Sequence, residues 1–287
     1  MKLASFDQGR IGVVQGDHIV DISDLVPAPP GFWPPIAMVQ LIAEFDALKA
    51  RIEEAARKRP SVPLASVRLE APVQWPNKLI AYPANYHAHA KEMQSSYRAD
   101  SQGFFLKANS SISGGSDPIV LPAIKGPEVH HECELAIFIG RGGRGISLQD
   151  AMHHIFGYAC LMDMTVRGKQ ERVMRKSFDT FCPIGPYIVT ADEVSEPAAL
   201  DLQLTVNGLV KQKANTRDLV LDIPNMIVMA SSVMTLYPGD IIATGTPEGV
   251  GPLAPGDEVT ITIAQVGSMT LPVVQGEIGD NLAFQTK

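Results

Sequence analysis

Two carboxylates stand two residues apart near the start of a strand-like segment, residues 130–140. Side chains alternate across a β-strand, so Glu132 and Glu134 are predicted to point to the same side. Two ionised carboxylates held close together repel each other, and burying them without a cation costs free energy. A hard divalent metal removes that cost because it prefers oxygen ligands. The spacing of the two glutamates therefore indicates a metal site.

A third carboxylate, Asp163, lies among apolar residues in a second strand-like segment, residues 157–165. With Glu132 and Glu134 it suggests a three-carboxylate site for Mg²⁺ or Mn²⁺. The alternative is that paired acids on strands are simply solvated. Cys133 lies between the two glutamates, so it is predicted to face away from them as a small buried core residue.

Composition narrows the class of protein. The chain has 287 residues, of which 45% are hydrophobic and 19% charged, so it can bury a substantial core. The formal net charge is -7 and no basic run occurs, which disfavours nucleic acid as a partner. No apolar run has the length of a signal peptide or a membrane span. Three cysteines without C-x-x-C spacing are typical of a reduced compartment. We therefore expect a cytoplasmic protein.

The order of predicted elements divides the chain in two. Residues 1–70 are expected to form a small N-terminal α+β domain, with short strands at 2–6, 10–14 and 18–22 and a helix at 36–58. Residues 71–287 are expected to form the main domain, mostly short strands, with helices at 84–93, 147–155, 169–174 and 222–234. Strands outnumber helices and do not alternate with them regularly, so the pattern predicts a β-rich α+β fold rather than a βαβ fold.

One motif suggests nucleotide binding but is better explained otherwise. Residues 140–145 match G-x-G-x-x-G, follow a strand and precede a predicted helix. However, Ser147 and Asp150 form an S-x-x-D capping box, so the helix should begin after the glycines. A central Rossmann strand is also apolar on both faces, whereas this one carries two glutamates. The motif is therefore interpreted as a flexible turn with two solvated arginines.

Cationic and amide side chains follow Asp163. Arg167 and Gln170 are three residues apart, which predicts one shared helical face. Arg167 can bind a carboxylate or enolate through its forked guanidinium, although a surface ion pair with Glu171 would be the ordinary alternative. Lys176 precedes a strand and could neutralise an oxyanion that develops near the metal.

Other candidates lie on both sides of the carboxylates. His89 and Glu92 are three residues apart on a predicted helix, where a carboxylate can fix the tautomer of an imidazole that acts as a general base. An exposed surface pair is the alternative. Lys107 ends an apolar strand, and Thr246 lies in a tight loop after another strand, where a simple turn is the ordinary explanation.

Taken in chain order, these motifs resemble the fumarylacetoacetate hydrolase family, and especially the bacterial acylpyruvate hydrolases within it. The motifs are N-Y-x-x-H-x-x-E-M, F-x-L-K, H-H-E-x-E-L, D-M-T-x-R-x-x-Q, K-S-F-D-T-F-C-P-x-G-P, V-N-G, N-T-R-D and G-D-I-I-x-T-G-T-P-x-G-V-G. The resemblance spans about residues 73–275, and residues 1–70 resemble the small N-terminal domain of bacterial members. It implies a β-rich mixed sandwich or roll, a homodimer, and bound Mg²⁺ or Mn²⁺.

The resemblance also implies roles for individual residues. The implied metal ligands are Glu132, Glu134 and Asp163. The implied catalytic residues are His89, Glu92 and Lys176, the first two on a mobile lid helix. The implied substrate contacts are Lys107, Arg167, Gln170 and Thr246. Two features depart from the family pattern. Gly168 stands where the family commonly has Asp, and the loop between Asp163 and Lys176 is shorter than in many members. Both border the substrate pocket, so they leave the native substrate open.

Together these features predict a metal-dependent hydrolase that cleaves a C–C bond in a β-diketo acid, such as an acylpyruvate or fumarylpyruvate. The 2-oxo acid end would chelate the metal, which would stabilise an enolate leaving group. His89, supported by Glu92, would activate water. Decarboxylation of a 2-oxo acid such as oxaloacetate, or isomerisation of a hydroxymuconate-type diene, could use the same enolate chemistry. A catalytically silent metal- or ligand-binding protein is a different class, which the full ligand set and the His-Glu pair disfavour.

Overall fold

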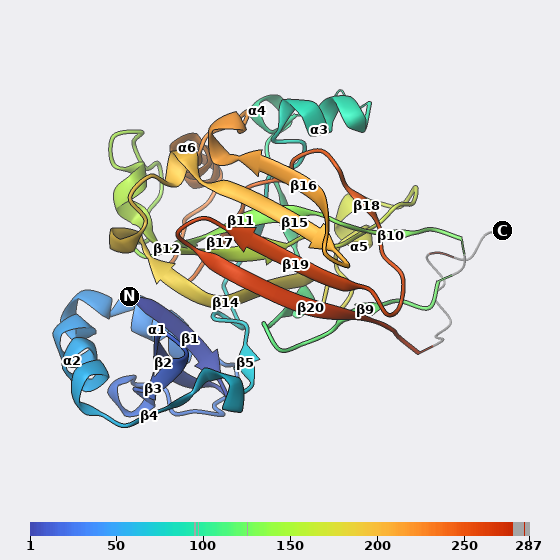
Figure 1. Cartoon of the computed structure of the whole chain (residues 1–287). Coiled ribbons are helices and arrows are strands. Elements are labelled where there is room, and N and C mark those ends of the chain that lie inside the picture. The colour runs from blue at the N-terminus through green and yellow to red at the C-terminus, as the bar shows by residue number, and fades with distance from the viewer. Residues whose placement is uncertain (95, 97, 125, 278–283, 285–287) are drawn as a thin grey trace.

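The computed structural model describes residues 1–94, 96, 98–124, 126–277 and 284, and Figure 1 shows their arrangement. Its largest sheet has twelve strands within this part of the chain. In spatial order the main path is β4 (Ser61–Pro63), β3 (His18–Asp21), β2 (Arg10–Gln15), β1 (Lys2–Phe6), β14 (Cys182–Thr190), β12 (Ile155–Met162), β11 (Cys133–Ile139), β17 (Ile241–Ala243), β6 (Leu79–Ala81) and β7 (Phe105–Lys107). Beside it, β5 (Leu69–Glu70) pairs with β1 and β8 (Ile112–Ser113) pairs with β14.

A second sheet packs across the centre of the first (Figure 1). Its order is β16 (Leu209–Asn215), β15 (Asp201–Val206), β19 (Glu258–Ile263), β20 (Gly267–Gln275) and β9 (Ile119–Leu121). Buried and more exposed residues alternate along β15 and β19, because one face packs on the core and the other faces solvent. A small sheet has the order β13 (Thr165–Val166), β10 (Val129–His131) and β18 (Gly251–Pro252). The prediction of a β-rich mixed fold is confirmed.

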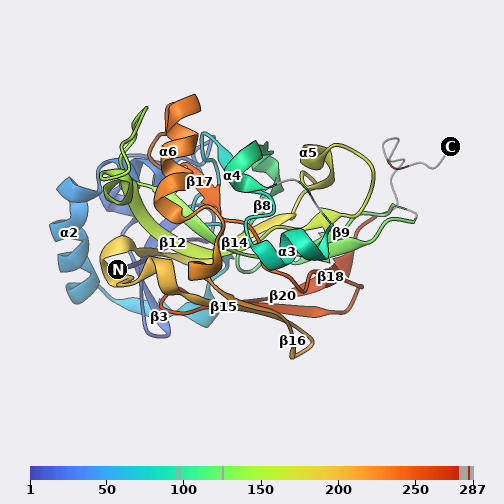
Figure 2. The same cartoon turned by 90° about the horizontal axis from the view of Figure 1, so that it is seen from above.

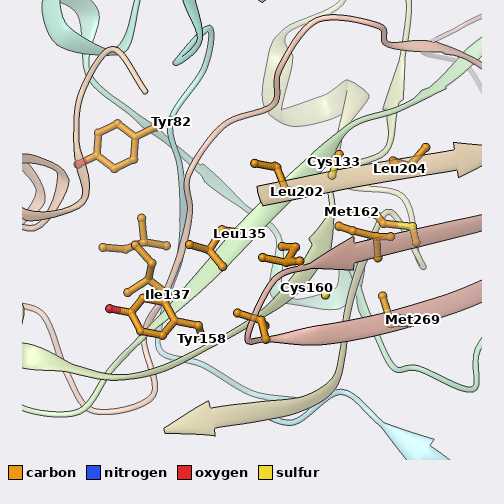
Figure 3. Packing of buried hydrophobic residues seen from close by; sticks show 14 of the residues in the cluster. Tyr82, Cys133, Leu135, Ile137, Tyr158, Cys160, Met162, Leu202, Leu204 and Met269 are labelled. Atoms are coloured by element: carbon orange, nitrogen blue, oxygen red, sulfur yellow. The ribbon is translucent and has the colours of Figure 1, made fainter. Parts of the chain in front are cut away.

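Strand β11 is buried on both faces. Leu135 and Ile137 belong to the core beneath the second sheet, where Figure 3 shows Ile137 beside Tyr158. Ala136 and Phe138 belong to a separate core that includes apolar residues of the N-terminal helices. Every residue of β11 is buried, as is every residue of β12. Layers on both sides therefore hold the start of β11 in a fixed position, and Glu134 with it.

The helices are short and lie around the sheets (Figures 1 and 2). They are α1 (Ala37–Ala43), α2 (Phe45–Lys58), α3 (His87–Glu92), α4 (Ala99–Gln102), α5 (Arg172–Arg175) and α6 (Ile223–Val233). The 3₁₀ turns are η1 (Ser23–Leu25), η2 (Leu64–Ser66), η3 (Asn109–Ser111), η4 (Ala151–His154), η5 (Ala191–Glu193), η6 (Pro197–Ala199) and η7 (Thr216–Asp218). The start of α6 is well specified, because Asp222 accepts a hydrogen bond from the Asn225 N–H at 3.0 Å. Within the described residues, none of the helices combines the length and apolarity needed to span a membrane.

Four predicted helices differ from the structure, and the one expected over 84–93 is the shorter helix α3. The helix expected over 36–58 is two helices, since the backbone leaves helical geometry at Glu44. This break brings Phe45 against Phe156 of the main body, with 4.9 Å between ring centroids. The helix expected over 147–155 is only the turn η4, although the Asp150 N–H does donate to Ser147 Oγ at 3.2 Å. The helix expected over 169–174 begins later and is the single turn α5.

The N-terminal segment is joined to the main body through the sheet. Strand β1 pairs with β14, with Lys2 opposite Val189 and Leu3 opposite Ile188. We propose that residues 1–70 form the small N-terminal α+β domain and residues 71–287 the catalytic domain, with the sheet continuous between them. In Figure 1 the N-terminal segment, in blue, lies at the end of the sheet remote from α3 and α4.

Candidate active site

The three predicted metal ligands come together at one end of β11. Glu134 lies in β11, Asp163 directly follows β12, and Glu132 lies in a break between β10 and β11. The expectation that both glutamates belong to one uninterrupted strand is therefore wrong. Cys133 pairs with Met162, and one step further the Asp163 N–H donates to the Glu132 carbonyl at 2.9 Å. This backbone hydrogen bond continues the strand pairing across the break and places Glu132 opposite Asp163.

One carboxylate oxygen from each of Glu132, Glu134 and Asp163 lies within 4.8 Å of the others, and all three residues are buried. Burial by itself would raise the pKa of Glu132, but the charges of Lys176 and Arg167 outweigh it and lower that pKa to about 2. Burial raises the pKa of Glu134, and the neighbouring Asp163 and Glu132 raise it further. The surrounding cations therefore stabilise the ionised form of Glu132, but they do not fully stabilise the ionised form of Glu134.

These residues fit a divalent cation. Three buried carboxylates, two around the start of β11 and one just after the end of β12, have oxygens within 4.8 Å of one another, and oxygen is the ligand atom that Mg²⁺ and Mn²⁺ prefer. The raised pKa of Glu134 reflects a cost of ionisation that a cation would remove. Among the described residues, no histidine or cysteine belongs to this group of potential ligands.

Two lysines border the carboxylates. Lys176 Nζ donates to Glu132 Oε2 and to Asp163 Oδ2, both at 2.7 Å. Lys107 is buried beneath Asp163, and its Nζ donates to Asp163 Oδ1 and to the Phe181 carbonyl. Burial would lower the pKa of Lys107, but Asp163 outweighs this effect and raises it, so Lys107 remains cationic.

His89 and Glu92 lie on α3 at the edge of the site. His89 is 6% exposed, and its Nδ1 is 3.0 Å from Glu92 Oε2. The other oxygen of Glu92 accepts the Gly249 N–H at 3.0 Å, which ties α3 to the loop after β17. Because an ionised carboxylate can only accept, Nδ1 of His89 is the protonated nitrogen and Nε2 carries the lone pair of the neutral ring. His87, in contrast, is exposed.

A cavity of about 210 Å³ joins these groups. Its wall consists of Tyr82, Pro83, Ala84, His89, Met93, Phe105, Glu132, Glu134, Asp163, Thr165, Arg167, Arg172, Arg175, Lys176 and Thr246. The structure therefore brings His89, the three carboxylates, Arg167, Lys176 and Thr246 to one cavity. Lys107 lies beneath this wall, and Glu92 lies behind His89.

Arg167 and Gln170 do not share a helical face as expected, because the chain is irregular between β13 and α5. Arg167 nevertheless donates from Nη2 to Glu132 Oε1 at 3.0 Å. Gln170 lies next to Gly168 and is outside the set of described side chains that form the cavity wall. A Cβ atom at Gly168 would lie 2.4 Å from Gln170 Oε1. The glycine at this position, where the family commonly has Asp, thus leaves room for the Gln170 side chain.

Sequence reasoning missed Gln212 of β16, which connects two parts of the site. Gln212 is 1% exposed. Its Oε1 accepts from the Cys133 N–H at 3.0 Å and lies 3.0 Å from His131 Nδ1. Its Nε2 donates to Thr246 Oγ1 at 2.8 Å and to the Pro247 carbonyl at 2.9 Å. Gln212 therefore links the metal-ligand strand to the loop that carries Thr246. No local pattern in β16 marks this role, because the partners are distant in sequence.

Arg172 and Arg175 were also missed, and both line the cavity. Their spacing was a usable signal, because residues three apart on a helix share a face. Arg175 donates from Nε to the Gln170 carbonyl at 2.8 Å, and the Arg172 guanidinium lies 5.3 Å from the centroid of the Phe105 ring.

The chain belongs to the fumarylacetoacetate hydrolase family. The family model described as fumarylacetoacetate (FAA) hydrolase C-terminal matches residues 78–274, which is more than half of the chain. A maleylpyruvate hydrolase from Aquipseudomonas alcaligenes is 40% identical over 285 residues, covering 95% of this chain and 99% of that protein. A mitochondrial oxaloacetate tautomerase from Homo sapiens is 38% identical over 255 residues, covering 84% of this chain and 80% of that protein.

A solved structure resembles the whole chain. It is the crystal structure of maleylpyruvate hydrolase from Sphingobium sp. SYK-6 in complex with manganese(II) ion and pyruvate. The similarity has a TM-score of 0.90 with 58% identity, and it covers 96% of this chain and 100% of that one. The predicted family membership is confirmed, and with the carboxylate cluster this relative supports a divalent metal in the present protein.

Proposed function

We propose that this protein is a metal-dependent hydrolase that cleaves the C–C bond of an acylpyruvate. The observation that carries the proposal is a buried three-carboxylate cluster in the same cavity as a histidine whose tautomer is fixed by a carboxylate. The relatives named maleylpyruvate hydrolase, one of them in complex with manganese(II) ion and pyruvate, support this assignment.

Glu132, Glu134 and Asp163 would hold the metal, which when bound supplies a Lewis acid for the oxygens of the 2-oxo acid end. His89 Nε2 would take a proton from a water molecule, while Glu92 stabilises the imidazolium that forms. The water oxygen would bond to the acyl carbonyl carbon, and the bond from that carbon to the methylene would then break. The electron pair would leave as the enolate of pyruvate, which a proton converts to pyruvate.

The cationic side chains at the site would each stabilise negative charge. Lys176 lies 2.7 Å from two of the carboxylates, so it would stabilise negative charge that develops on a substrate oxygen beside them. Arg167 and Thr246 line the same cavity and would bind substrate oxygens, whereas Gln170, the third predicted substrate contact on this side, lies outside the described cavity wall. Lys107 would hold Asp163 in place from beneath.

We expect Mg²⁺ or Mn²⁺ as the metal, since both suit an all-carboxylate site. We also expect a cytoplasmic homodimer. The three cysteines are free and buried, which agrees with a reduced compartment. Analytical ultracentrifugation would test the oligomeric state.

The assignment can be tested with purified protein treated with a chelator and then supplied with Mg²⁺ or Mn²⁺. We expect metal-dependent loss of acylpyruvate and release of one pyruvate per substrate. A panel of acylpyruvates, oxaloacetate and hydroxymuconates would separate the possible reactions. Metal-dependent turnover confined to oxaloacetate or hydroxymuconates would replace hydrolysis with decarboxylation, tautomerisation or isomerisation. Absence of turnover on the whole panel would favour a binding protein.

A further inference from the structure

The side-chain amide of Gln212 is buried on β16 and uses both of its ends. Its Oε1 lies 3.0 Å from the Cys133 nitrogen and 3.0 Å from His131 Nδ1. Its Nε2 lies 2.8 Å from Thr246 Oγ1 and 2.9 Å from the Pro247 carbonyl oxygen. Two acceptor contacts and two donor contacts complete the hydrogen bonding of an amide, so the side chain is held in one orientation.

The backbone partners fix which end of this amide is oxygen. The Cys133 N–H can only donate, so the atom that it contacts is the amide oxygen. The Pro247 carbonyl can only accept, so the atom that it contacts is the amide nitrogen. His131 agrees with both assignments: burial lowers its pKa, and the neutral ring donates from Nδ1 to the amide oxygen.

The orientation of Gln212 decides what the Thr246 hydroxyl can do. Nε2 donates to Thr246 Oγ1, so the proton of the hydroxyl must point elsewhere. Within the described part of the chain, that proton has only the Pro247 carbonyl within reach, at a long 3.5 Å. The same carbonyl already accepts from Gln212 at 2.9 Å. Because Thr246 lines the cavity, its proton is available to a ligand bound there.

The loop that carries Thr246 is also fixed to the carboxylate cluster without the help of Gln212. The Gly245 N–H donates to Glu134 Oε2 at 2.7 Å, which places the next residue beside a proposed metal ligand. A Cβ atom at Gly245 would lie 2.7 Å from the Tyr82 carbonyl oxygen, so the loop packs closely against neighbouring backbone. Loss of the Gln212 amide should therefore change the direction of the hydroxyl more than the position of the loop.

We infer that Gln212 is a positioning residue that makes Thr246 a hydrogen-bond donor to an anionic oxygen of the substrate. The inference rests on the proposed function, in which the 2-oxo acid end of an acylpyruvate brings carboxylate and ketone oxygens to the metal ligands. A hydrogen bond to an ionised acceptor is stronger than one to a neutral acceptor. Gln212 reaches the substrate only through Thr246, so its effect should appear in binding of the 2-oxo acid end.

Binding of pyruvate to the manganese-loaded protein tests this arrangement, because pyruvate carries the 2-oxo acid end and its binding requires no turnover. Thr246→Val removes the hydroxyl and should weaken pyruvate binding roughly tenfold. Gln212→Met keeps a side chain of similar length that cannot donate. The Pro247 carbonyl then loses its partner, so the Thr246 hydroxyl should turn to it and pyruvate binding should weaken by the same factor. Thr246→Ser keeps the hydroxyl and should bind pyruvate nearly as well as the wild type.

A double-mutant cycle, measured by calorimetric titration at saturating Mn²⁺, distinguishes positioning from a general structural role. The variant with both Gln212→Met and Thr246→Val should bind pyruvate no more weakly than Thr246→Val alone, because the two changes remove one interaction. Additive losses in the double variant would overturn the inference, as would wild-type affinity in Gln212→Met.

The matched control is Gln203→Met on the neighbouring strand β15. Gln203 lies between the buried Leu202 and Leu204, so it faces the other side of the second sheet. This variant should bind pyruvate with wild-type affinity. A loss equal to that of Gln212→Met would show that pyruvate affinity reports damage to the sheet, and the positioning role would be wrong.

A second variant keeps the test decisive if Gln212→Met fails to fold. In Gln212→Glu the carboxylate still accepts from the Cys133 N–H and from His131, but it can only accept from Thr246 and turns the hydroxyl away from the cavity. The same tenfold loss and the same non-additivity with Thr246→Val are expected. If neither variant folds, equal pyruvate affinity of Thr246→Val and Thr246→Ser would contradict the donor role of the hydroxyl.

Turnover assays show separately whether the hydrolase assignment stands. Wild-type protein that hydrolyses acylpyruvates, together with a Gln212→Met variant that binds pyruvate normally, would overturn the inference and leave the proposed function intact. The expected pattern of pyruvate affinities in a protein that hydrolyses no acylpyruvate would support the inference and overturn the hydrolase. Absence of pyruvate binding to the manganese-loaded wild type would overturn the inference itself.

Discussion

The two ends of β11 differ in what explains their residues. At the far end, residues 140–145 form a turn in which packing requires glycine at position 142: a Cβ atom there would lie 2.7 Å from the Leu236 carbonyl oxygen. Gly143 also exchanges two backbone hydrogen bonds with Leu236, so the turn is anchored rather than flexible as expected. At the near end, Glu134 is buried with a raised pKa. Neighbouring backbone accounts for the first end. At the second end Glu134 accepts a hydrogen bond from the Gly245 N–H at 2.7 Å, yet its pKa remains raised, as expected of a carboxylate placed to bind a cation.

This comparison teaches how to separate a structural motif from a functional one. The glycines resemble a nucleotide-binding motif in sequence, yet the space that Gly140, Gly142 and Gly143 leave is filled by the chain itself, and Gly145 has a positive φ of 63°. The carboxylates belong to no comparably well-known motif, yet burying them costs free energy unless a cation compensates their charge. For a candidate site, the useful question is therefore whether other residues of the folded chain already fill its space and pair its polar and charged groups.

The largest expected effect is at the near end of β11. Replacing Glu134→Ala removes one of three proposed metal ligands and should reduce metal-dependent turnover at least about a thousandfold. The fold should remain, because the change removes an unfavourable charge from the interior. Calorimetric titration with Mn²⁺ and turnover assays would measure both effects. Unchanged metal affinity and turnover would show that Glu134 is not a ligand.

The next effect concerns the water-activating pair. His89→Ala and Glu92→Ala should each lower kcat for acylpyruvate hydrolysis by roughly 10²–10⁴-fold, the usual contribution of general acid–base catalysis. Turnover of oxaloacetate should fall less, because it needs no activated water. Steady-state kinetics on both substrates would test this. Full acylpyruvate turnover in both variants would refute the proposed role of His89.

At the glycine end we expect lost stability without lost chemistry. Gly142→Ala should lower the free energy of unfolding by about 1–3 kcal/mol, because the new methyl group overlaps the Leu236 carbonyl. Its affinity for Mn²⁺ should equal that of the wild type. Arg141→Ala, an exposed position in the same turn, is the control and should be neutral. Denaturant unfolding and metal titration would measure the two quantities. Reduced metal affinity in a folded Gly142→Ala protein would contradict the separation of the two ends.

The smallest effect is a dependence of metal binding on pH. The pKa of Glu134 is raised in the folded metal-free protein, so its proton is lost at higher pH than in the unfolded chain. Ionisation of Glu134 therefore destabilises the metal-free protein as pH rises above the unfolded pKa of about 4.5, and bound metal offsets this loss. The increase in Tm caused by Mn²⁺ should be larger at pH 8 than at pH 5.5. A smaller increase at pH 8 would contradict the assigned shift.

The sequence was most informative where function depends on residue type. Glu132, Glu134 and Asp163 were identified from charge placed in apolar strands, and the β-rich fold from the distribution of short strands. The break in the strand at Glu132 was not predictable, since it depends on pairing with Asp163 and with β18. The short helices near residues 150 and 172 were overestimated, because local pattern carries no information on tertiary packing.

Residues that act through distant partners could not be found from sequence. Gln212 is 79 residues from Cys133 and 34 from Thr246, so its role exists only after β16 has joined the second sheet. Arg172 and Arg175 could be recognised from their spacing as a basic pair on one helical face, but the spacing alone does not show that this face lines the cavity.

The pairing of β1 with β14 has a consequence for any shortened form of the protein. Beyond the two β1–β14 residue pairs, Leu3 packs in the same core as Ile184 and Ile188 of β14. A chain cut at residue 70 would leave this flank of β14 as an open sheet edge lined by apolar side chains. Such edges bind other strands without regard to sequence, so the shortened chain would aggregate even with its metal ligands unchanged. The N-terminal segment thus serves as a cover for the sheet, independent of any part in the chemistry.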